Sequence, residues 1–293
     1  MKLIVNASAG TAARDLEEVR AACAAAGLQI DIVSATADEK IGAVVRRAIA
    51  ESDAAVVAAG GDGTISAVAS ELAGSGRTLG VLPLGTLNHF AKDLGIPMDL
   101  EGAARVIAAG RTVEVDVAEV NGATFINNSS LGIYPQIVSK REAQQERLAR
   151  GKWPAFVWAT MHALRRFPFL TLRVTLEHEQ LTRRTAFLFV GNNEYEISGF
   201  RIGARAALDR GQLGLYLTHR TGRFGLLRLA LRALFHQLEQ AKDFEVYRVT
   251  EVTIESRRER LLVARDGEVE WIRSPLHYRT RPRALKVFAP ANE

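Results

Sequence analysis

Hydrophobic and polar positions follow two different rhythms along this 293-residue chain. Up to about residue 117, short apolar runs alternate with segments whose apolar positions recur at helical spacing. The continuous apolar run at 54–59 is typical of a strand that is covered on both faces. Further strands are predicted at 3–5, 29–33 and 79–82, and helices at 12–26, 41–49 and 65–72. This alternation predicts a parallel sheet with helices on its faces.

The pattern changes to period two at about Thr112. Strands are then predicted at 112–117, 123–127, 170–176, 184–190, 213–218, 246–254, 260–264, 269–273 and 284–288. Two helical stretches, 138–166 and 223–241, interrupt this β-rich region. No flexible linker marks the boundary near residue 117, so we expect the two regions to share strands or a tight interface.

Composition narrows the class of protein. Hydrophobic residues make up 47% of the chain and charged residues 24%, which is the balance of a soluble globular protein. The single cysteine, Cys23, excludes an internal disulfide framework and a cysteine-rich zinc site, and it fits a reducing cytoplasm. No apolar run approaches the roughly 18 residues of a membrane span, and the N-terminal apolar run is too short for a signal peptide.

Charge is distributed unevenly. Residues 1–117 carry 10 Lys and Arg against 15 Asp and Glu, whereas residues 118–293 carry 28 against 18. Such a basic half favours an anionic partner, unless it is simply a solvated surface. Basic and aromatic residues interleave at 140–173 and 220–235, as in helices at a membrane interface, although these apolar residues could also face the core. No nucleic-acid-binding motif accompanies the charge, so we expect an anionic membrane surface as partner and no nucleic acid.

The segment Gly60-Gly61-Asp62-Gly63-Thr64 is the most informative stretch of the sequence. It joins a buried-type strand to a helix, and its glycines allow the backbone to turn sharply and to approach a ligand closely. The helix start presents free N–H groups, which are a natural site for phosphate. Asp62 can orient the turn or bind a Mg²⁺ ion that bridges phosphates, and Thr64 can cap the helix or contact a phosphate. The alternative is a tight strand–helix turn without a ligand.

A second loop of the same kind contains Gly85, Thr86 and Asn88, and a weaker third candidate contains Asn6, Ser8 and Gly10. Each follows a predicted strand, so we expect all three at the carboxyl edge of the sheet, where open α/β sheets bind ligands. The chain contains no Walker-type phosphate loop, no dinucleotide fingerprint, no His-Glu-x-x-His motif and no Gly-x-Ser-x-Gly elbow.

At these residues the sequence resembles the diacylglycerol kinase catalytic-domain family, which includes sphingosine, ceramide and bacterial lipid kinases. The resemblance runs along nearly the whole chain and rests on residues 6–10, 60–64, 85–91, 127–133 and 266–268. It implies an α/β nucleotide-binding domain at 1–117, a β-sandwich domain at 118–279, and a last strand at about 280–293 that returns to the first domain. It also implies ATP and Mg²⁺, with a lipid hydroxyl as acceptor.

By this resemblance Asp266 is the general base that accepts the proton of the lipid hydroxyl. Gly267 permits the turn, and Glu268 helps to place Asp266 or a metal ion. The alternative is a simple hairpin turn, since Asp-Gly between alternating segments is a strong hairpin signal. Within a lipid kinase, the acceptor could be diacylglycerol, phosphatidylglycerol, a ceramide or a sphingoid base.

Several positions depart from the family pattern. His89 stands where the family often has Asp, and Asp209 is the acid that remains of a segment that in some members holds a structural Mg²⁺. Asp62 and Asp209 are therefore the candidate metal ligands. A NAD kinase, which also uses Gly-Gly-Asp-Gly, is the rival enzyme, and Asn193-Glu194 could be its Asn-Glu pair. A catalytically silent lipid-binding protein on the same fold is the second rival.

We expect the protein to be located in the cytoplasm and to associate peripherally with a membrane. Exposed strand edges would also permit a homodimer.

Overall fold

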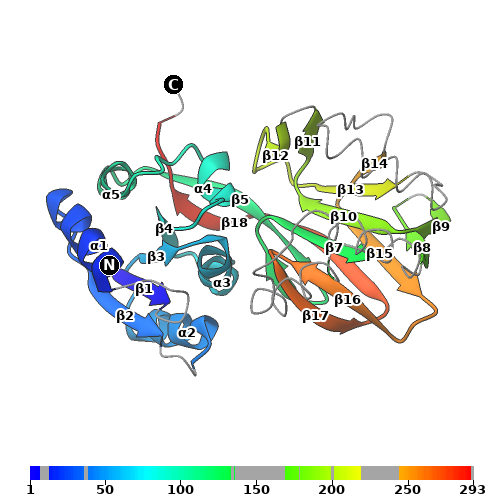
Figure 1. Cartoon of the computed structure of the whole chain (residues 1–293), viewed down its shortest axis with the longest axis horizontal. Coiled ribbons are helices and arrows are strands. Elements are labelled where there is room, and N and C mark those ends of the chain that lie inside the picture. Colours follow the sequence, from blue (N-terminus) through cyan, green and yellow to red (C-terminus); the bar gives the residue numbers. More distant parts are fainter. Residues whose placement is uncertain are drawn as a thin grey trace, which may run out of the picture. The chain divides into compact units, whose positions relative to one another are not determined.

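A computed structural model describes residues 1–6, 13–35, 39–132, 135, 169–177, 179–198, 201–218 and 244–291 (Figure 1). The chain forms two compact units. The first consists of Met1–Asn127, Arg205–Gly211 and Thr280–Glu293, and the second of Asn128–Ala204 and Gln212–Arg279.

The first unit is built on a parallel sheet with the strand order β2-β1-β3-β4-β18. Its elements are β1 (Lys2–Asn6), α1 (Ala13–Ala25), β2 (Asp31–Ala35), α2 (Ile41–Glu51), β3 (Val56–Gly60), α3 (Asp62–Leu72), β4 (Thr78–Pro83), α4 (His89–Asp93), α5 (Leu100–Ala108), β5 (Thr112–Val120), β6 (Ala123–Phe125) and the later part of β18 (Leu276–Phe288). Strand β3 is buried along its whole length, because it lies in the middle of the sheet with helices over both faces.

Helices cover this sheet in two pairs. Helix α1 contacts α5, and α2 contacts α3, so the two pairs lie on opposite faces (Figure 1). The apolar faces of α2 and α5 explain this packing, since Val44, Val45 and Ala48 of α2 and Ala103, Ala104 and Ile107 of α5 are buried. One apolar core therefore joins the helices to the strands.

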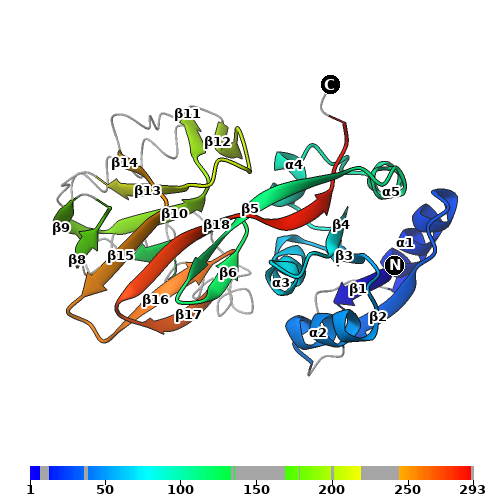
Figure 2. The same ribbon diagram turned by 180° about the vertical axis from the view of Figure 1, so that it is seen from behind.

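The last strand and an inserted segment complete the first unit. Strand β18 pairs in parallel with β4, matching Lys286 with Thr78, and it also pairs with β5, beside which it runs in Figure 2. The Asp116 carboxylate of β5, which is 1% exposed, accepts the N–H of Gly211 (2.6 Å) and the N–H of Arg283 (2.8 Å). The bond to Arg283 stabilises the left-handed backbone of this residue (φ 51°), a conformation that residues other than glycine rarely adopt. Asp116 thus fastens both the inserted segment and β18.

The second unit is a sandwich of two mainly antiparallel sheets. One has the order β14-β13-β10-β7-β16-β17, the other joins the early part of β18 to β15, β8 and β9, and β11 and β12 form a separate two-stranded sheet. The strands are β7 (Asn128–Gly132), β8 (Leu170–Thr175), β9 (Gln180–Thr185), β10 (Phe187–Asn192), β11 (Tyr195–Ser198), β12 (Arg201–Arg205), β13 (Leu213–Thr218), β14 (Phe244–Val249), β15 (Glu251–Ser256), β16 (Arg260–Arg265) and β17 (Glu268–Arg273). Buried and exposed residues alternate along β8, as expected when one face of a sheet packs on another sheet.

The predicted fold class, an α/β nucleotide-binding-type domain followed by a β-sandwich, is confirmed. The first unit extends to Asn127, beyond the boundary expected near residue 117, because β5 and β6 pair with each other and β5 pairs with β18. The predicted helical stretches at 138–166 and 223–241 lie outside the described residues. No helix in the described part of the chain is long and apolar enough to cross a membrane.

Replacing Asp116 by Ala tests the fastening role of its carboxylate. The change removes the acceptor for two backbone N–H groups, so we expect the free energy of unfolding to fall by about 2–4 kcal/mol. Urea denaturation of the intact chain measures this loss. Glu114→Ala, on the same strand but exposed, is the matched control and should change stability little. Equal effects of the two changes would contradict the role of Asp116.

Candidate functional site

The first glycine loop occupies the end of β3 and the start of α3. Gly60 is the last residue of the strand, and a Cβ there would lie 2.6 Å from the Cβ of Thr64, which is itself buried. Gly61 is the N-cap of α3, and no side chain caps the helix. The first-turn N–H groups of an eleven-residue helix therefore remain for water or a ligand.

The second glycine loop follows β4 and is shaped by Asn88. The Asn88 side chain accepts the N–H of Gly85 (3.0 Å) and donates to the carbonyl oxygen of Gly85 (2.7 Å). Asn88 is buried and has a left-handed backbone (φ 49°), a conformation that Asn tolerates better than most residues. The side chain of Asn88 thus closes the loop on itself, whereas Thr86 is exposed at its tip.

The structure brings these two loops into direct contact. A Cβ on Gly85 would lie 2.6 Å from the Cα of Gly61, closer than real Cβ atoms come to backbone. The N–H of Leu84 donates to the carbonyl oxygen of Gly60 (3.0 Å). The Asp62 carboxylate of the first loop accepts the N–H of His89 at the end of the second (2.8 Å). Asp62 therefore has a positioning role toward the second loop.

The third candidate loop is only partly described. Asn6 is the last residue of β1, which pairs in parallel with β3 and matches Val5 with Ala59. Asn6 therefore ends its strand at the same edge of the sheet as Gly60. Ser8 and Gly10 lie outside the described residues.

In the second unit, Asp266 and Gly267 form the two-residue turn between β16 and β17. Both have positive φ values (47° and 91°), as the favoured hairpin turns require. One carboxylate oxygen of Asp266 accepts the N–H of Asn128 (3.0 Å), and the N–H of Asp266 donates to the carbonyl oxygen of Asn128 (2.9 Å). Asp266 thus belongs to the hairpin turn, and its bonds to Asn128 of β7 fix the orientation of its carboxylate. Glu268, the first residue of β17, is exposed.

A buried pair of hydroxyl groups joins the strands behind this turn, and the sequence patterns did not reveal it. The Ser129 hydroxyl donates to the carbonyl oxygen of Ala264 (3.0 Å) and lies 3.0 Å from the hydroxyl oxygen of Tyr278. Burial raises the pKa of Tyr278 above its ordinary value, so this hydroxyl stays protonated and uncharged. Ser129 and Tyr278 are both buried, and neither belongs to a motif that the sequence analysis singled out as a catalytic candidate.

Asp209 lies in the inserted segment 205–211 of the first unit. Asp209 is exposed, and no three acidic, His or Cys side chains gather closely enough to hold a metal ion in the described part of the chain. The adjoining turn is held by Asp116, which accepts the N–H of Gly211. Asp62 and Asp209 both stay predicted metal ligands, since Mg²⁺ in nucleotide sites takes one or two carboxylates and completes its shell with phosphates and water.

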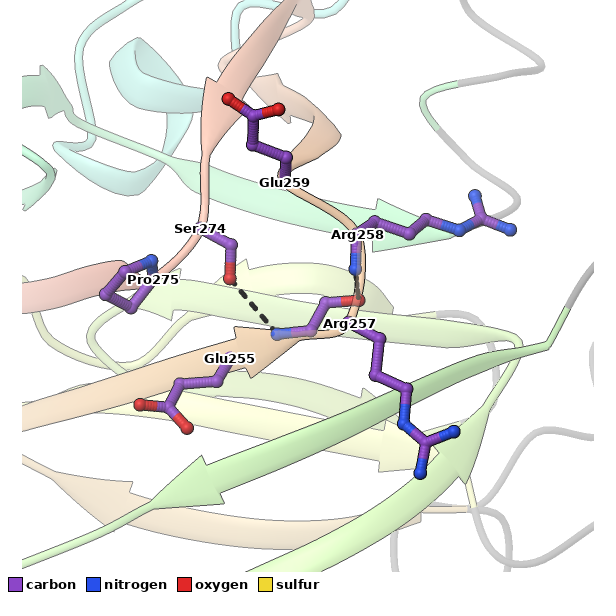
Figure 3. A pocket seen from close by; sticks show the side chains of 7 residues that line it. Glu255, Arg257, Arg258, Glu259, Ser274 and Pro275 are labelled. Atoms are coloured by element: carbon purple, nitrogen blue, oxygen red, sulfur yellow. Dashed lines mark hydrogen bonds between the residues drawn. The ribbon is translucent and has the colours of Figure 1, made fainter.

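A shallow hollow of about 320 Å³ lies elsewhere in the second unit (Figure 3). Residues 255–259, between β15 and β16, line it with Ser274 and Pro275, and the Ser274 hydroxyl accepts the N–H of Ser256 (3.1 Å). The guanidinium groups of Arg257 and Arg258 point away from each other and do not converge on an anion. Since Asp266 follows the opposite end of β16, this hollow is not the candidate site.

Comparison with known proteins identifies the family of this chain. The model of the diacylglycerol kinase catalytic domain matches residues 1–120, and the model of the YegS C-terminal NAD kinase beta sandwich-like domain matches residues 134–289. The chain belongs to the diacylglycerol kinase catalytic-domain family. The predicted family is therefore confirmed.

Named relatives agree with the family. A Staphylococcus aureus diacylglycerol kinase is 27% identical over 271 residues, which cover 88% of this chain and 82% of that protein. A Klebsiella pneumoniae protein named probable lipid kinase YegS-like is 48% identical over 88 residues, which cover 29% of this chain and 30% of that protein. The matched region thus spans less than two thirds of the latter relative's length. The crystal structure of a putative diacylglycerol kinase from Bacillus anthracis has the same fold, with a TM-score of 0.74, 22% identity and coverage of 99% of this chain and 97% of that one.

Replacing Gly85 by Ala tests the contact between the two loops. The new Cβ would press on the Gly61 backbone, so we expect the free energy of unfolding to fall by about 1–3 kcal/mol. Thermal unfolding of the intact chain measures the effect. Gly63→Ala is the control, because a Cβ at this position in α3 meets nothing within 4 Å and alanine favours a helix. A Gly85→Ala protein as stable as the Gly63→Ala protein would contradict the contact.

Proposed function

We propose that this protein is a lipid kinase, which transfers the γ-phosphoryl group of ATP to a hydroxyl group of a membrane lipid. The observation that carries the proposal is the contact between the two glycine loops of the first unit, which Asp62 fastens through the N–H of His89. Glycine turns at the ends of adjacent strands β3 and β4 place backbone N–H groups at one edge of a parallel sheet. Nucleotide phosphates bind at such edges.

In this proposal the first loop binds the phosphates of ATP. The uncapped first turn of α3 provides N–H donors and the positive end of the helix dipole. The space beside Gly63 is open, whereas Gly60 and Gly61 pack against Thr64 and Gly85 and bring the turn close to the helix start. The predicted binding residues Asn6, Ser8, Gly10, Thr86 and Asn88 belong to loops that follow strands of the same sheet. Asp62 would hold Mg²⁺, which neutralises the charge that develops on the transferred group.

Asp266 acts as the general base of the proposed reaction. Its N–H and one of its carboxylate oxygens are bonded to Asn128, so the carboxylate is held in a fixed orientation. A fixed carboxylate can accept the proton of an alcohol while the oxygen attacks the γ-phosphorus of ATP and the bond to ADP breaks. Glu268, two residues further on, contributes negative charge near the same turn.

The acceptor is proposed to be a lipid for three reasons. The relatives named above are a diacylglycerol kinase and a probable lipid kinase. The basic half of the chain suits an anionic membrane surface, although the basic stretches at 140–168 and 220–235 lie outside the described residues. In addition, the sheet that holds Asp266 carries half-buried Phe187, Phe189 and Val246, an apolar surface that suits an acyl chain.

NAD is a weaker candidate as acceptor. The carboxylate of Glu194, which a NAD kinase would need for its Asn-Glu pair, forms two charge-assisted hydrogen bonds with Arg248 (2.7 and 2.6 Å). Lipid and NAD can be separated in one assay of the full chain with Mg²⁺ and labelled ATP. The lipids are diacylglycerol, phosphatidylglycerol, ceramide and sphingosine in mixed micelles, and NAD is tested alone. Label in a lipid would support the proposal, whereas label only in NAD, or none from folded protein, would overturn it.

Replacing Asp266 by Asn tests the base. Asn keeps an oxygen that can accept the N–H of Asn128, and it tolerates positive φ, so the turn should persist. We expect kcat for lipid phosphorylation to fall roughly 10²–10⁴-fold because the proton acceptor is lost. The thermal midpoint should stay the same.

Glu270→Gln provides the matched control for this variant. It removes a carboxylate from the same hairpin, where the exposed Glu270 pairs with Arg265 (2.9 Å). Activity should survive this change. Full activity in the Asp266→Asn protein would remove Asp266 as the base.

A further inference from the structure

The second glycine loop is attached to the fold at two points. It leads directly into the short helix α4, whose first residue, His89, is bonded to Asp62. The last residue of α4, Asp93, makes the other attachment. Because α4 has only five residues, a shift at Asp93 would be transmitted to the loop within about one and a half turns.

The partner of Asp93 is Arg205, which comes from the inserted segment 205–211. The Arg205 Nε donates to the Asp93 carboxylate (2.7 Å), and the two residues are 112 positions apart. The other guanidinium nitrogens donate to the carbonyl oxygen of Ile126 (2.6 Å) and to the side-chain oxygen of Asn127 (2.9 Å). All these residues belong to the first unit.

The ion pair between Arg205 and Asp93 is buried, and this burial restricts its geometry. The side chains of Arg205 and Asp93 are 0% and 7% exposed. A buried ion pair adds little net stability, because the cost of removing two charges from water offsets their attraction. It does restrict geometry, since the planar guanidinium group must satisfy acceptors in fixed directions. Arg205 therefore sets where the end of α4 lies relative to Ile126 and Asn127.

The inserted segment is itself held firmly at its other end. Asp116 of β5 accepts the N–H of Gly211 (2.6 Å), and the N–H of Asp116 donates to the carbonyl oxygen of Leu208 (2.8 Å). Leu208 is buried in the apolar core of the first unit. Arg205 thus projects from a segment that is anchored to the sheet, and it provides a rigid support for α4.

We infer that Arg205 is a positioning residue for the nucleotide: through Asp93 and α4 it holds the loop Gly85–Asn88 in the conformation that binds ATP. This inference rests on the proposed function, because it assumes that the two glycine loops bind the phosphates. Arg205 acts on the ATP-binding loop through Asp93 and α4. Its loss should therefore weaken the binding of ATP and leave the KM for the lipid unchanged.

The experiment measures ATP affinity in Arg205→Met and Arg205→Lys. The Kd for MgATP by calorimetry and the KM values for ATP and for the lipid are determined for each full-length protein. We expect Arg205→Met to raise the Kd and the KM for ATP about tenfold, as the loss of one hydrogen-bonded attachment would. The KM for the lipid should not change. Arg205→Lys, which can pair with Asp93 but cannot donate in three directions, should recover part of the affinity.

Arg77→Met is the matched control. Arg77 also belongs to the first unit, and its guanidinium group donates to the carbonyl oxygens of Ser52 and Ile49 and pairs with Asp53. It precedes β4, at the end of the sheet opposite the glycine loops. Its loss should lower the thermal midpoint and leave the Kd for ATP unchanged. If Arg205→Met does not fold, Asp93→Asn replaces it, since this change removes the charge of the pair but keeps an oxygen that can accept from Arg205.

The outcomes separate this inference from the proposed function. If the unaltered protein binds no ATP, the proposed function fails and the inference fails with it. If the unaltered protein binds ATP but the Arg205 or Asp93 variant binds it equally well, the inference alone is overturned, and Arg205 serves only stability. Equal weakening of ATP and lipid KM values would overturn it as well.

Discussion

The close approach of two backbone turns, at Gly61 and Gly85, constrains the whole carboxyl edge of the first sheet. A Cβ on Gly85 would come within 2.6 Å of the Gly61 backbone, whereas a Cβ on Gly61 would lie at a tight 3.3 Å from the Cα of Gly85, so the touching turns at the ends of β3 and β4 require glycine above all at position 85. The contact brings Asp62 within reach of the N–H of His89, and the bond between them joins α3 to α4. The position of the carboxylate proposed to hold Mg²⁺ therefore depends on backbone packing between two glycines.

Charged side chains hold the more distant parts of each unit together, and they do so mainly through backbone groups. Asp116 binds the N–H groups of Gly211 and Arg283, Arg205 binds a carbonyl oxygen as well as Asp93, and Asp266 binds the N–H of Asn128. Asp116 and Arg205 are buried, and a charge that is removed from water must be paired and hydrogen-bonded, because the apolar interior does not stabilise it. Each of these residues therefore defines one geometry, and segments far apart in the sequence are held in register.

Much of the fold and part of the candidate site could be predicted from local patterns. The apolar run at 54–59 became the buried strand β3, because a strand covered on both faces needs apolar side chains along its whole length. The glycine loops could be found because a glycine cluster between a strand and a helix marks a place where the backbone is approached closely. Asp266-Gly267 carried two interpretations, and the hairpin turn is present, while the proton-accepting role is a proposal. The side chain of His89 departs from the family pattern, but the structure shows a bond from its backbone N–H, which the Asp62 carboxylate accepts.

The sequence by itself determined the order of strands and helices, the family, and the glycine turns after β3 and β4, because these depend on side-chain periodicity and on the sterics of single residues. Only the tertiary structure decided which charges meet. Asp209 in the segment 205–211 is predicted as a metal ligand, and the structure shows in addition the bonds of Arg205 and Gly211, which no sequence pattern indicated. Asp93 and Arg205 are 112 positions apart and become neighbours only because the segment 205–211 folds into the first unit. No pattern in the sequence predicts this contact, because it depends on tertiary structure.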